Sequence, residues 1–164
     1  MKYEAFSTVF KSQIFALDHF RLLSLAKEVC KKLYSDYVDF SDKYHWGDKE
    51  FLLDAILSIE NLNSSQLTQK KIADTLSQLD TITPDIDDFE SDVLASAALN
   101  ACVAVSYTFQ FIADKKPNHI YHVGICLTDT IDCKIQEQKE LDEEAIDNNP
   151  LMIEARKYLI DKSK

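Results

Sequence analysis

Apolar side chains recur every three or four positions along most of the chain, which is the spacing of one face of an α-helix. In residues 19–34, for example, Leu22, Leu25, Val29 and Leu33 form one such stripe. The same spacing predicts further helices at residues 3–15, 36–44, 49–60, 66–79, 91–114, 118–138 and 150–162, and a short helix that begins at Asp142 or Glu143. The sequence therefore predicts an all-α fold, a single-domain bundle of about seven or eight helices over residues 1–164.

The segment from Ser91 to Asp114 is the most apolar part of the chain, and its first half is rich in alanine. A helix that is apolar nearly all round is typical of a buried position, and small side chains let neighbouring helices approach closely. We therefore expect this helix to be the centre of the bundle. No apolar run is expected to reach membrane-spanning length.

Several predicted helix ends carry residues with a clear capping role. Gly47 is predicted to end one helix and Asp48 to cap the next. The predicted loop at residues 61–65 ends in serines that suit the start of another helix. Asn149 followed by Pro150 has the pattern of an N-cap and a first helical residue.

The amino-acid composition supports an all-α fold and excludes some classes of binding partner. The chain has 164 residues, 46% of them hydrophobic, with only two glycines and three prolines, so it lacks the turn residues of a β-sandwich or barrel. The net charge of −10 and the presence of only two arginines disfavour nucleic-acid binding and an arginine-lined anion pocket. No nucleic acid and no membrane are therefore expected as partners.

The four cysteines, Cys30, Cys102, Cys126 and Cys133, form no CxxC pair. Cys126 and Cys133 lie about 10 Å apart along one predicted helix, which is too far for a disulfide. The N-terminal residues also lack the apolar core of a signal peptide. We therefore expect a cytoplasmic protein with reduced thiols.

Several stretches of the chain resemble the YjaG-like family, an all-helical bacterial family with no assigned function. They are residues 30–40 (CKKLYSDYVDF) with 46–48, 84–89 (PDIDDF) with 97–106 (AALNACVAVS), and 142–144 with 149–151. The resemblance covers most of the chain from about Asp18 onward. Family members usually continue past Lys164, and the middle of the 118–138 helix diverges, so it implies a shortened or divergent member. It implies an all-helical fold and no activity.

No catalytic signature is present. Two glycines cannot build the phosphate-binding loops of the Rossmann or P-loop kinds, and the chain has no GxSxG motif. A thiol nucleophile remains an alternative if Cys30 or Cys102 meets His45 in space, but buried core cysteines are the favoured interpretation. We expect no enzymatic activity and no cofactor.

One stripe of the 118–138 helix carries residues of metal-ligand type: His119, His122, Cys126, Asp129 and Cys133. It spans about 21 Å, so a single ion would take only adjacent members such as His119, His122 and Cys126. The alternative is a half-buried polar seam with cysteines packed inward. We favour the seam and expect no metal.

Acidic side chains gather in two places, at residues 80–92, which contain no base, and at residues 137–147, which contain one. Both stretches precede predicted helices, where carboxylates cap amides, but caps use only one or two of them. The surplus predicts a binding surface for a basic partner, formed by Asp85, Asp87, Asp88, Glu90, Glu140, Asp142, Glu143 and Glu144. Because residues 84–89 also carry the family resemblance, part of the first stretch is expected to serve the fold. The second stretch, residues 137–147, is therefore the better candidate for the partner-binding surface.

Three functions remain open. The first is a non-enzymatic acidic protein-binding module, most concretely an immunity protein (an antitoxin) that neutralises a basic bacterial toxin such as a nuclease. The second is a housekeeping cytosolic YjaG-like protein, as a homodimer. The third and least favoured is a metal- or thiol-dependent enzyme. Trp46 is either an anchor for a partner or, as we favour, a plug at the end of the core.

Overall fold

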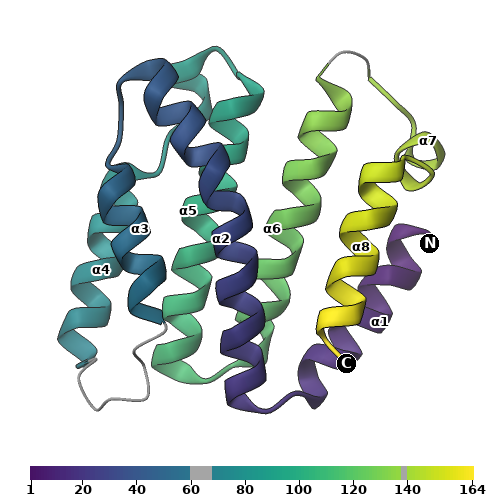
Figure 1. Cartoon of the computed structure of the whole chain (residues 1–164), viewed down its shortest axis with the longest axis horizontal. Coiled ribbons are helices and arrows are strands. Elements are labelled where there is room, and N and C mark those ends of the chain that lie inside the picture. Colours follow the sequence, from purple (N-terminus) through teal and green to yellow (C-terminus); the bar gives the residue numbers. More distant parts are fainter. Residues whose placement is uncertain (60–67, 138–139) are drawn as a thin grey trace.

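The computed structural model describes residues 1–59, 68–137 and 140–164, and it confirms the all-α prediction. Its elements are α1 Tyr3–Ala16, α2 His19–Tyr44, α3 Lys49–Ser58, α4 Gln69–Ile82, the 3₁₀-helix η2 Ile86–Phe89, α5 Val93–Asp114, α6 Pro117–Gln136, α7 Glu143–Asp147 and α8 Pro150–Lys162. Within those described residues no strand occurs. The chain folds as one helical bundle (Figure 1).

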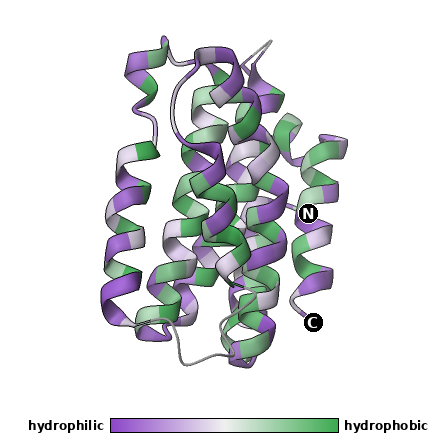
Figure 2. Ribbon diagram, turned by 60° about the vertical axis from the view of Figure 1, so that its left-hand side comes forward, coloured by the Kyte–Doolittle hydropathy of each residue, from purple (hydrophilic) through white to green (hydrophobic). Residues whose placement is uncertain are grey.

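Helix α5 lies at the centre, as predicted, with α2 and α6 as its main neighbours (Figure 1). Helices α3 and α4 cover one side of this trio, while α1 and α8 cover α6 on the other. The small side chains of α5 face the core, where Ala95, Ala98, Ala101 and Ala104 are at most 1% exposed. Figure 2 shows that hydrophobic residues concentrate on the inward sides of the helices. Burial of this face holds the bundle together.

The expectation that no apolar run reaches membrane-spanning length is wrong for α5. Its 22 residues, with a mean hydropathy of 1.3, are long and apolar enough to cross a membrane by length and composition. Half of that window is buried inside the bundle, against α2 and α6. The central position of the helix accounts for its apolar character without a membrane.

Helix α2 is one continuous helix, which corrects the predicted break between residues 34 and 36. Leu33, Tyr37 and Phe40 continue its buried stripe, each at most 1% exposed. Ser35 is exposed on the opposite side, where its hydroxyl donates to the carbonyl of Lys32 at 3.2 Å without interrupting the helix. The helix ends at Tyr44, as predicted, and its C-cap is His45, with a left-handed φ of 48°, and not Gly47.

The start of α4 is Gln69, with Thr68 as the cap, and not residue 66 as predicted. The predicted loop at residues 61–65 lies outside the described residues. Other caps are confirmed: Asp48 accepts from the amide of Phe51 at 2.8 Å, and Asn149 from that of Leu151 at 3.0 Å. These short polar side chains supply acceptors that the first turn of a helix lacks.

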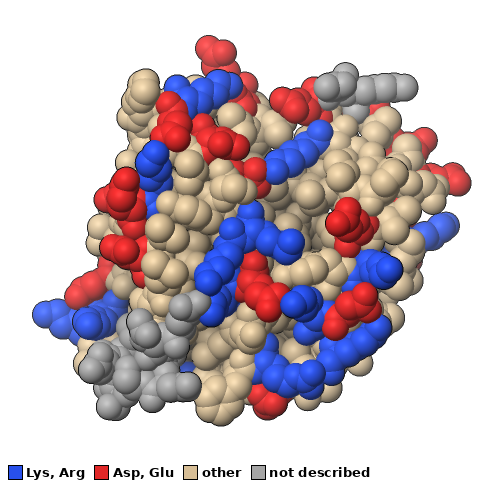
Figure 3. Space-filling model, viewed as in Figure 1, with Lys and Arg blue, Asp and Glu red and all other residues tan. Residues whose placement is uncertain are grey.

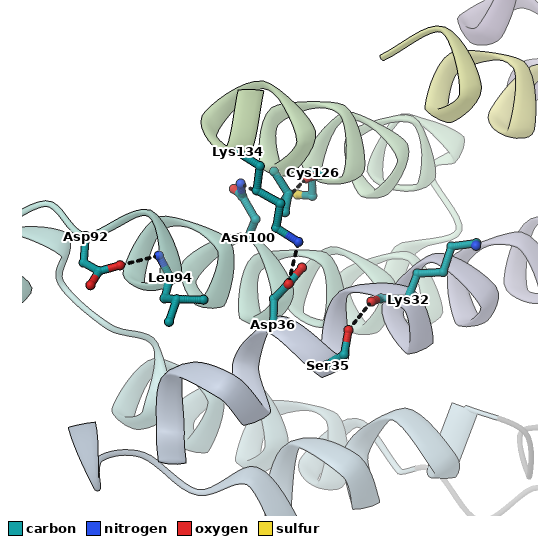
Figure 4. A network of polar contacts seen from close by, with 9 residues as sticks. Lys32, Ser35, Asp36, Asp92, Leu94, Asn100, Cys126 and Lys134 are labelled. Atoms are coloured by element: carbon teal, nitrogen blue, oxygen red, sulfur yellow. Dashed lines mark hydrogen bonds and ion pairs between the residues drawn. The ribbon is translucent and has the colours of Figure 1, made fainter. Parts of the chain in front are cut away.

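A polar seam joins α2, α5 and α6 within the otherwise apolar core. Lys134 of α6 donates to Asp36 of α2 at 2.6 Å, and Asp36 is only 8% exposed. Beside them, the amide of Asn100 in α5 donates to the hydroxyl of Thr130 in α6 at 3.1 Å (Figure 4). Because each buried polar group has a partner, the seam fixes how the three helices lie along one another.

Candidate functional site: an acidic cavity beside the second acidic stretch

The two acidic stretches lie at the same end of the bundle, where α2 and α6 end and α5 begins (Figure 1). The first stretch forms η2, and Asp85, Asp87, Asp88 and Glu90 are all exposed there. Asp85 accepts from the amide of Asp87 at 3.1 Å, so it is a cap, as its position before a helix suggested. Of these four, Asp87, Asp88 and Glu90 therefore remain as exposed carboxylates beyond the cap.

Asp92 is the best-anchored acid of the first stretch. It forms an ion pair with Lys43, accepts from the hydroxyl of Tyr44 at 2.6 Å, and caps α5 by accepting from the amide of Leu94 at 2.7 Å. The contact with Lys43, followed by that with Tyr44, lowers the pKa of Asp92 to about 2. This carboxylate serves the fold and is not available to a partner.

A pH prediction follows for Asp92. Its pKa is depressed in the folded protein, so its contribution to stability is present above the ordinary value of 3.8 and is lost as the pH falls towards about 2. In urea unfolding between pH 2 and 5, we expect the Asp92→Asn variant to lose less stability on acidification than the parent protein. The exposed residue Asp74 of α4 provides the control Asp74→Asn, whose profile should follow that of the parent. Parallel profiles for Asp92→Asn and the parent would contradict the assignment.

The second stretch surrounds the short helix α7. Asp142 caps it by accepting from the amide of Ala145 at 2.8 Å. Glu140 and Glu144 are exposed to solvent, and Glu143 reaches into an adjacent cavity. Figure 3 shows acidic side chains at this end of the molecule, with some basic ones among them, and a group of mainly basic side chains over the lower parts of α2 and α8.

The cavity beside α7 has a volume of about 480 Å³. It lies between the start of α1, one face of α6, helix α7 and the first half of α8. Its lining includes five carboxylates and two basic side chains, and the whole set is Lys2, Tyr3, Glu4, Thr128, Asp129, Asp132, Glu143, Ile146, Asp147, Met152 and Arg156. Its volume is in the range of about 300–1,000 Å³ that is usual for ligand sites.

Arg156 of α8 forms the buried wall of this cavity and is 4% exposed. Its Nη1 donates to Asp147 and to the main-chain carbonyl of Met1, each at 2.6 Å. Its Nε is buried and has no partner within the described structure. The positive charge of Arg156 is thus matched by Asp147, while one of its N–H groups still lacks an acceptor.

The remaining carboxylates of the cavity are less well compensated. In the part of the chain that the structure describes, no ion pair uses Glu4, Asp129 or Glu143. Asp129 is open to the water of the cavity but recessed among protein atoms. This desolvation, together with the nearby charge of Asp132, raises its pKa. The cavity therefore has an excess of negative charge close to the α7 surface.

Asp129 provides a second prediction. Since its pKa is raised in the folded protein, ionisation of Asp129 costs stability. This cost begins as the pH rises above the ordinary value of 3.8 and is complete above the raised pKa. We expect Asp129→Asn to raise the melting temperature at pH 7, and the gain to vanish below the ordinary pKa of 3.8. Scanning calorimetry at the two pH values measures this difference. A lower melting temperature at pH 7 would show that the carboxylate stabilises the fold.

A family model described as "Protein of unknown function (DUF416)" matches residues 9–160. The chain belongs to the DUF416 family. Its fold is similar to the crystal structure, at 1.91 Å resolution, of a DUF416 family protein from Shewanella baltica OS155. The TM-score is 0.82 and the identity 22%, over 93% of this chain and 82% of that one, so the likeness shows the fold alone. No curated relative matches the chain.

Membership of the DUF416 family confirms the expectation of a bacterial family without assigned function, but neither comparison links the chain to the YjaG-like family specifically. It does not point to the cavity, which joins side chains from the two ends of the chain. Tyr3 and Arg156 are more than 150 residues apart in sequence and meet only in the folded protein. The scarcity of arginine argued against an arginine-lined pocket, but one buried arginine beside Asp147 is sufficient to form this wall.

The stripe of metal-ligand residues on α6 does not converge in this DUF416 domain. His119 contacts Asp114 at 3.1 Å, and His122 stacks on Tyr107 with 5.1 Å between ring centroids. Cys126 is 5% exposed, while Asp129 faces the cavity. Among the described residues no group of three or more His, Cys, Asp or Glu side chains is arranged to hold a metal. These contacts agree with the alternative interpretation of the stripe, a half-buried polar face of α6 with cysteines packed inward.

Cys30, Cys102 and Trp46 pack within or against the core, which agrees with the favoured interpretations of buried cysteines and a tryptophan plug. The Sγ of Cys30 lies 3.6 Å from the hydroxyl of Thr108, and burial raises the pKa of Cys30 and Cys102 to about 12, so neither is an activated nucleophile. Trp46 packs edge-on against Phe40 and Phe89, with centroid distances of 5.8 and 5.5 Å. It closes the end of the core beside η2.

Proposed function

We propose that this DUF416 protein is a non-catalytic module that binds a basic protein partner at the α6–α7 end of the bundle. The observation that carries the proposal is the cavity beside α7, where the carboxylates of Glu4, Asp129 and Glu143 enter no ion pair with the described residues. These three side chains are exposed, so their carboxylates are open to a partner. A cation brought by a partner would offset the repulsion between the negative charges of the cavity.

The surface around the cavity favours a protein partner. Glu140 and Glu144 are exposed beside it, and the carboxylates of η2 lie at the same end of the bundle (Figure 1). With the net charge of −10, they attract a basic surface before contact, which speeds association and disfavours acidic competitors.

The concrete form that we propose is an immunity protein, an antitoxin that neutralises a basic bacterial toxin such as a nuclease in the cytoplasm. Its support is the small acidic bundle, the four free cysteines and the lack of a catalytic motif. A neighbouring gene for a large secreted protein with a basic C-terminal domain would agree with this form. If the product of such a gene is no less toxic when the two are co-expressed, the antitoxin form is wrong.

A second candidate is a housekeeping member of the YjaG-like kind, acting as a homodimer. Membership of a family of unknown function is compatible with it. Several apolar side chains on the outer faces of α1 and α8 are exposed, at 54% for Phe15, 52% for Leu151 and 45% for Ile153. Such residues are also common on monomers. Light scattering after gel filtration measures the oligomeric state. A dimer that does not bind basic peptides would favour this candidate over the binding module.

The binding proposal is tested with a fluorescent eight-residue peptide that carries four lysines. We expect Glu140→Gln/Glu144→Gln to weaken binding by about three- to tenfold in low salt, since exposed ion pairs contribute about 0.2–1 kcal/mol each. The matched control Asp54→Asn/Asp74→Asn removes the same charge from exposed sites on α3 and α4. Equal losses in the two variants, or no binding by the parent, would overturn the proposal.

A further inference from the structure

We propose that the lower end of the bundle in Figure 1, where α1 meets α2 and α5 meets α6, binds an anionic lipid surface through two exposed phenylalanines and the basic side chains beside them. This end is called the basic tip, and it consists of Lys11, Phe15, Phe20, Arg21, Lys115 and Lys116. The inference goes beyond the proposed function, because the acidic surface proposed for the basic partner lies at the opposite end of the bundle.

Phe15 and Phe20 differ from the other phenylalanines of the chain. Of the nine, seven lie in the core or pack against it, whereas Phe15 is 54% and Phe20 67% exposed. Phe15 comes one residue before the end of α1, and Phe20 is the second residue of α2, so both lie beside the turn that joins the two helices. Large apolar rings in water have a free-energy cost, which contact with an apolar medium removes.

Basic side chains accompany these rings. Lys11 lies about one helical turn before Phe15, and Arg21 directly follows the second ring. Burial, followed by the charge of Lys115, lowers the pKa of His19, so the end of α5 lies close to the start of α2. Lys11, Arg21 and Lys115 form no ion pair with the residues that the structure describes. Their charges are therefore open to an anionic surface.

The acidic side chains of this end already have partners within the fold. Asp18 caps α2 by accepting from the amide of Arg21 at 3.0 Å. Asp114 contacts Lys116 at 3.2 Å and His119 at 3.1 Å. Residues 11–21 and 114–119 together carry four basic and two acidic side chains, so the tip is positive although the whole chain has a net charge of −10.

The fold separates the basic tip from the two acidic stretches. Helices η2 and α7 lie at the opposite end of the bundle (Figure 1), while mainly basic side chains cover the lower parts of α2 and α8 (Figure 3). An anionic surface therefore attracts the tip and repels the acidic end, which orients the molecule on it. The expectation of no membrane partner came from the net charge, which averages over both ends.

A lipid surface fits two protruding rings better than a folded partner does. A protein partner needs a preformed hollow for each ring, whereas lipid head groups and acyl chains rearrange around an apolar side chain. A shallow groove of about 360 Å³ along α1 adds an amine and hydroxyl groups that suit a lipid phosphate, and its lining is Ser7, Thr8, Lys11, Ser12 and Phe15. Aromatic and basic side chains on one surface are typical of proteins that lie on a membrane.

The test measures co-sedimentation of the full chain with vesicles of phosphatidylcholine, either alone or mixed with phosphatidylglycerol. We expect the anionic vesicles to bind the protein at least about tenfold more tightly, since each basic side chain near such a surface contributes about fivefold. Added salt should weaken this binding. Equal binding to the two kinds of vesicle, or binding to neither, would overturn the proposal.

The phenylalanines are tested by Phe15→Ser/Phe20→Ser, which should weaken binding to the anionic vesicles by about tenfold or more, because two rings no longer enter the lipid. The matched control Leu151→Ser/Ile153→Ser removes two other exposed apolar side chains, at 52% and 45%, from α8. The control should bind like the parent protein. Equal binding by the phenylalanine variant and the control would contradict the role of the tip.

The charges are tested by Arg21→Gln/Lys115→Gln, which should also weaken binding by about tenfold or more. The control Lys2→Gln/Lys157→Gln removes the same charge from exposed positions before α1 and in the middle of α8, and its loss should be smaller. Melting curves verify that all variants fold, and the charge variant decides if the serine variant does not. The same loss in both charge variants would mean that binding depends on the overall charge and not on the tip.

Phe20→Trp measures insertion directly. Brominated acyl chains should quench the fluorescence of the added tryptophan, but not that of Trp46, which packs against Phe89 of η2 at the opposite end. The control Ile153→Trp should not be quenched on the same vesicles. A Phe20→Trp variant that binds vesicles without being quenched would overturn the proposal.

A second copy of the chain is the alternative occupant of the tip. If the parent protein ignores vesicles but forms a dimer that Phe15→Ser/Phe20→Ser dissociates, the tip is a dimer interface and the lipid assignment is wrong. The proposed function is tested separately, because the four-lysine peptide is expected at the opposite end. Phe15→Ser/Phe20→Ser should therefore bind that peptide like the parent protein, whichever result the vesicles give.

Discussion

Replacing Gly124 by alanine is expected to lower the free energy of unfolding by about 1–3 kcal/mol. Gly124 lies inside α6, where it faces α1, and a Cβ atom there would lie 2.4 Å from two ring carbons of Phe10. Phe10 is fully buried and stacked on Phe6, with 5.4 Å between their ring centroids, so its ring cannot move aside freely. Urea unfolding of the variant and the parent protein measures the loss.

The sign of the change in stability distinguishes a steric clash from the effect of helix propensity. In an unconstrained helix, glycine to alanine raises stability by about 1 kcal/mol, so a loss shows that the approach of α1 to α6 requires a bare backbone at this position. The smaller ring-free side chain of Phe10→Leu should restore part of the loss when it is combined with Gly124→Ala. If the two substitutions are simply additive, the contact between them is not the cause.

Replacing Arg156 by leucine is expected to cost about 3–5 kcal/mol, the usual loss when one partner of a buried ion pair is removed. The side chain of Asp147 is only 15% exposed, and without Arg156 its carboxylate has no cation. The main-chain carbonyl of Met1 also loses its donor. The start of α1 and helix α7 should therefore detach from α8. Urea unfolding measures the loss, and faster amide exchange in α1 and α7 locates it.

Two controls separate this pair from ordinary surface charges. Lys164→Met removes the cation of an exposed pair with Asp161 and is expected to cost less than about 1 kcal/mol. The double variant Arg156→Leu/Asp147→Leu should recover most of the loss, because two apolar partners leave no charge buried. A double variant as unstable as Arg156→Leu alone would mean that the packing of the arginine, and not its charge, holds α8 in place.

The same cavity thus combines strong structural contacts with uncompensated charge. Arg156 and Asp147 tie α7, α8 and the N-terminal residues together, while the pKa of Asp129 in the same lining is raised by desolvation and by the charge of Asp132. A perturbed carboxylate in a ligand-sized cavity is typical of a binding site.

The extent to which the sequence predicted the fold depends on how local each signal is. Caps at Asp48 and Asn149 were predicted correctly, and the start of α7 at Glu143 was one of the two predicted, because a capping side chain bonds an amide only two or three residues away. The break predicted between residues 34 and 36 was wrong because the buried stripe through Tyr37 and Phe40 outweighs the weak helix preference of serine and aspartate. The helix end at Tyr44 was predicted correctly, but the left-handed C-cap is His45, while Gly47, with a φ of 82°, lies two residues further along the turn.

By itself the sequence determined the all-α class, the central position of α5, most helix boundaries and the concentration of acids near one end, since all of these depend on periodicity and local hydrogen bonds. The cavity was decided only by the tertiary structure. It brings Tyr3 of α1 beside Arg156 of α8 and adds Asp129 of α6 to the same lining. No local pattern records such contacts, because burial, desolvation and the missing partner of Arg156 Nε arise only when α1, α7 and α8 pack against α6.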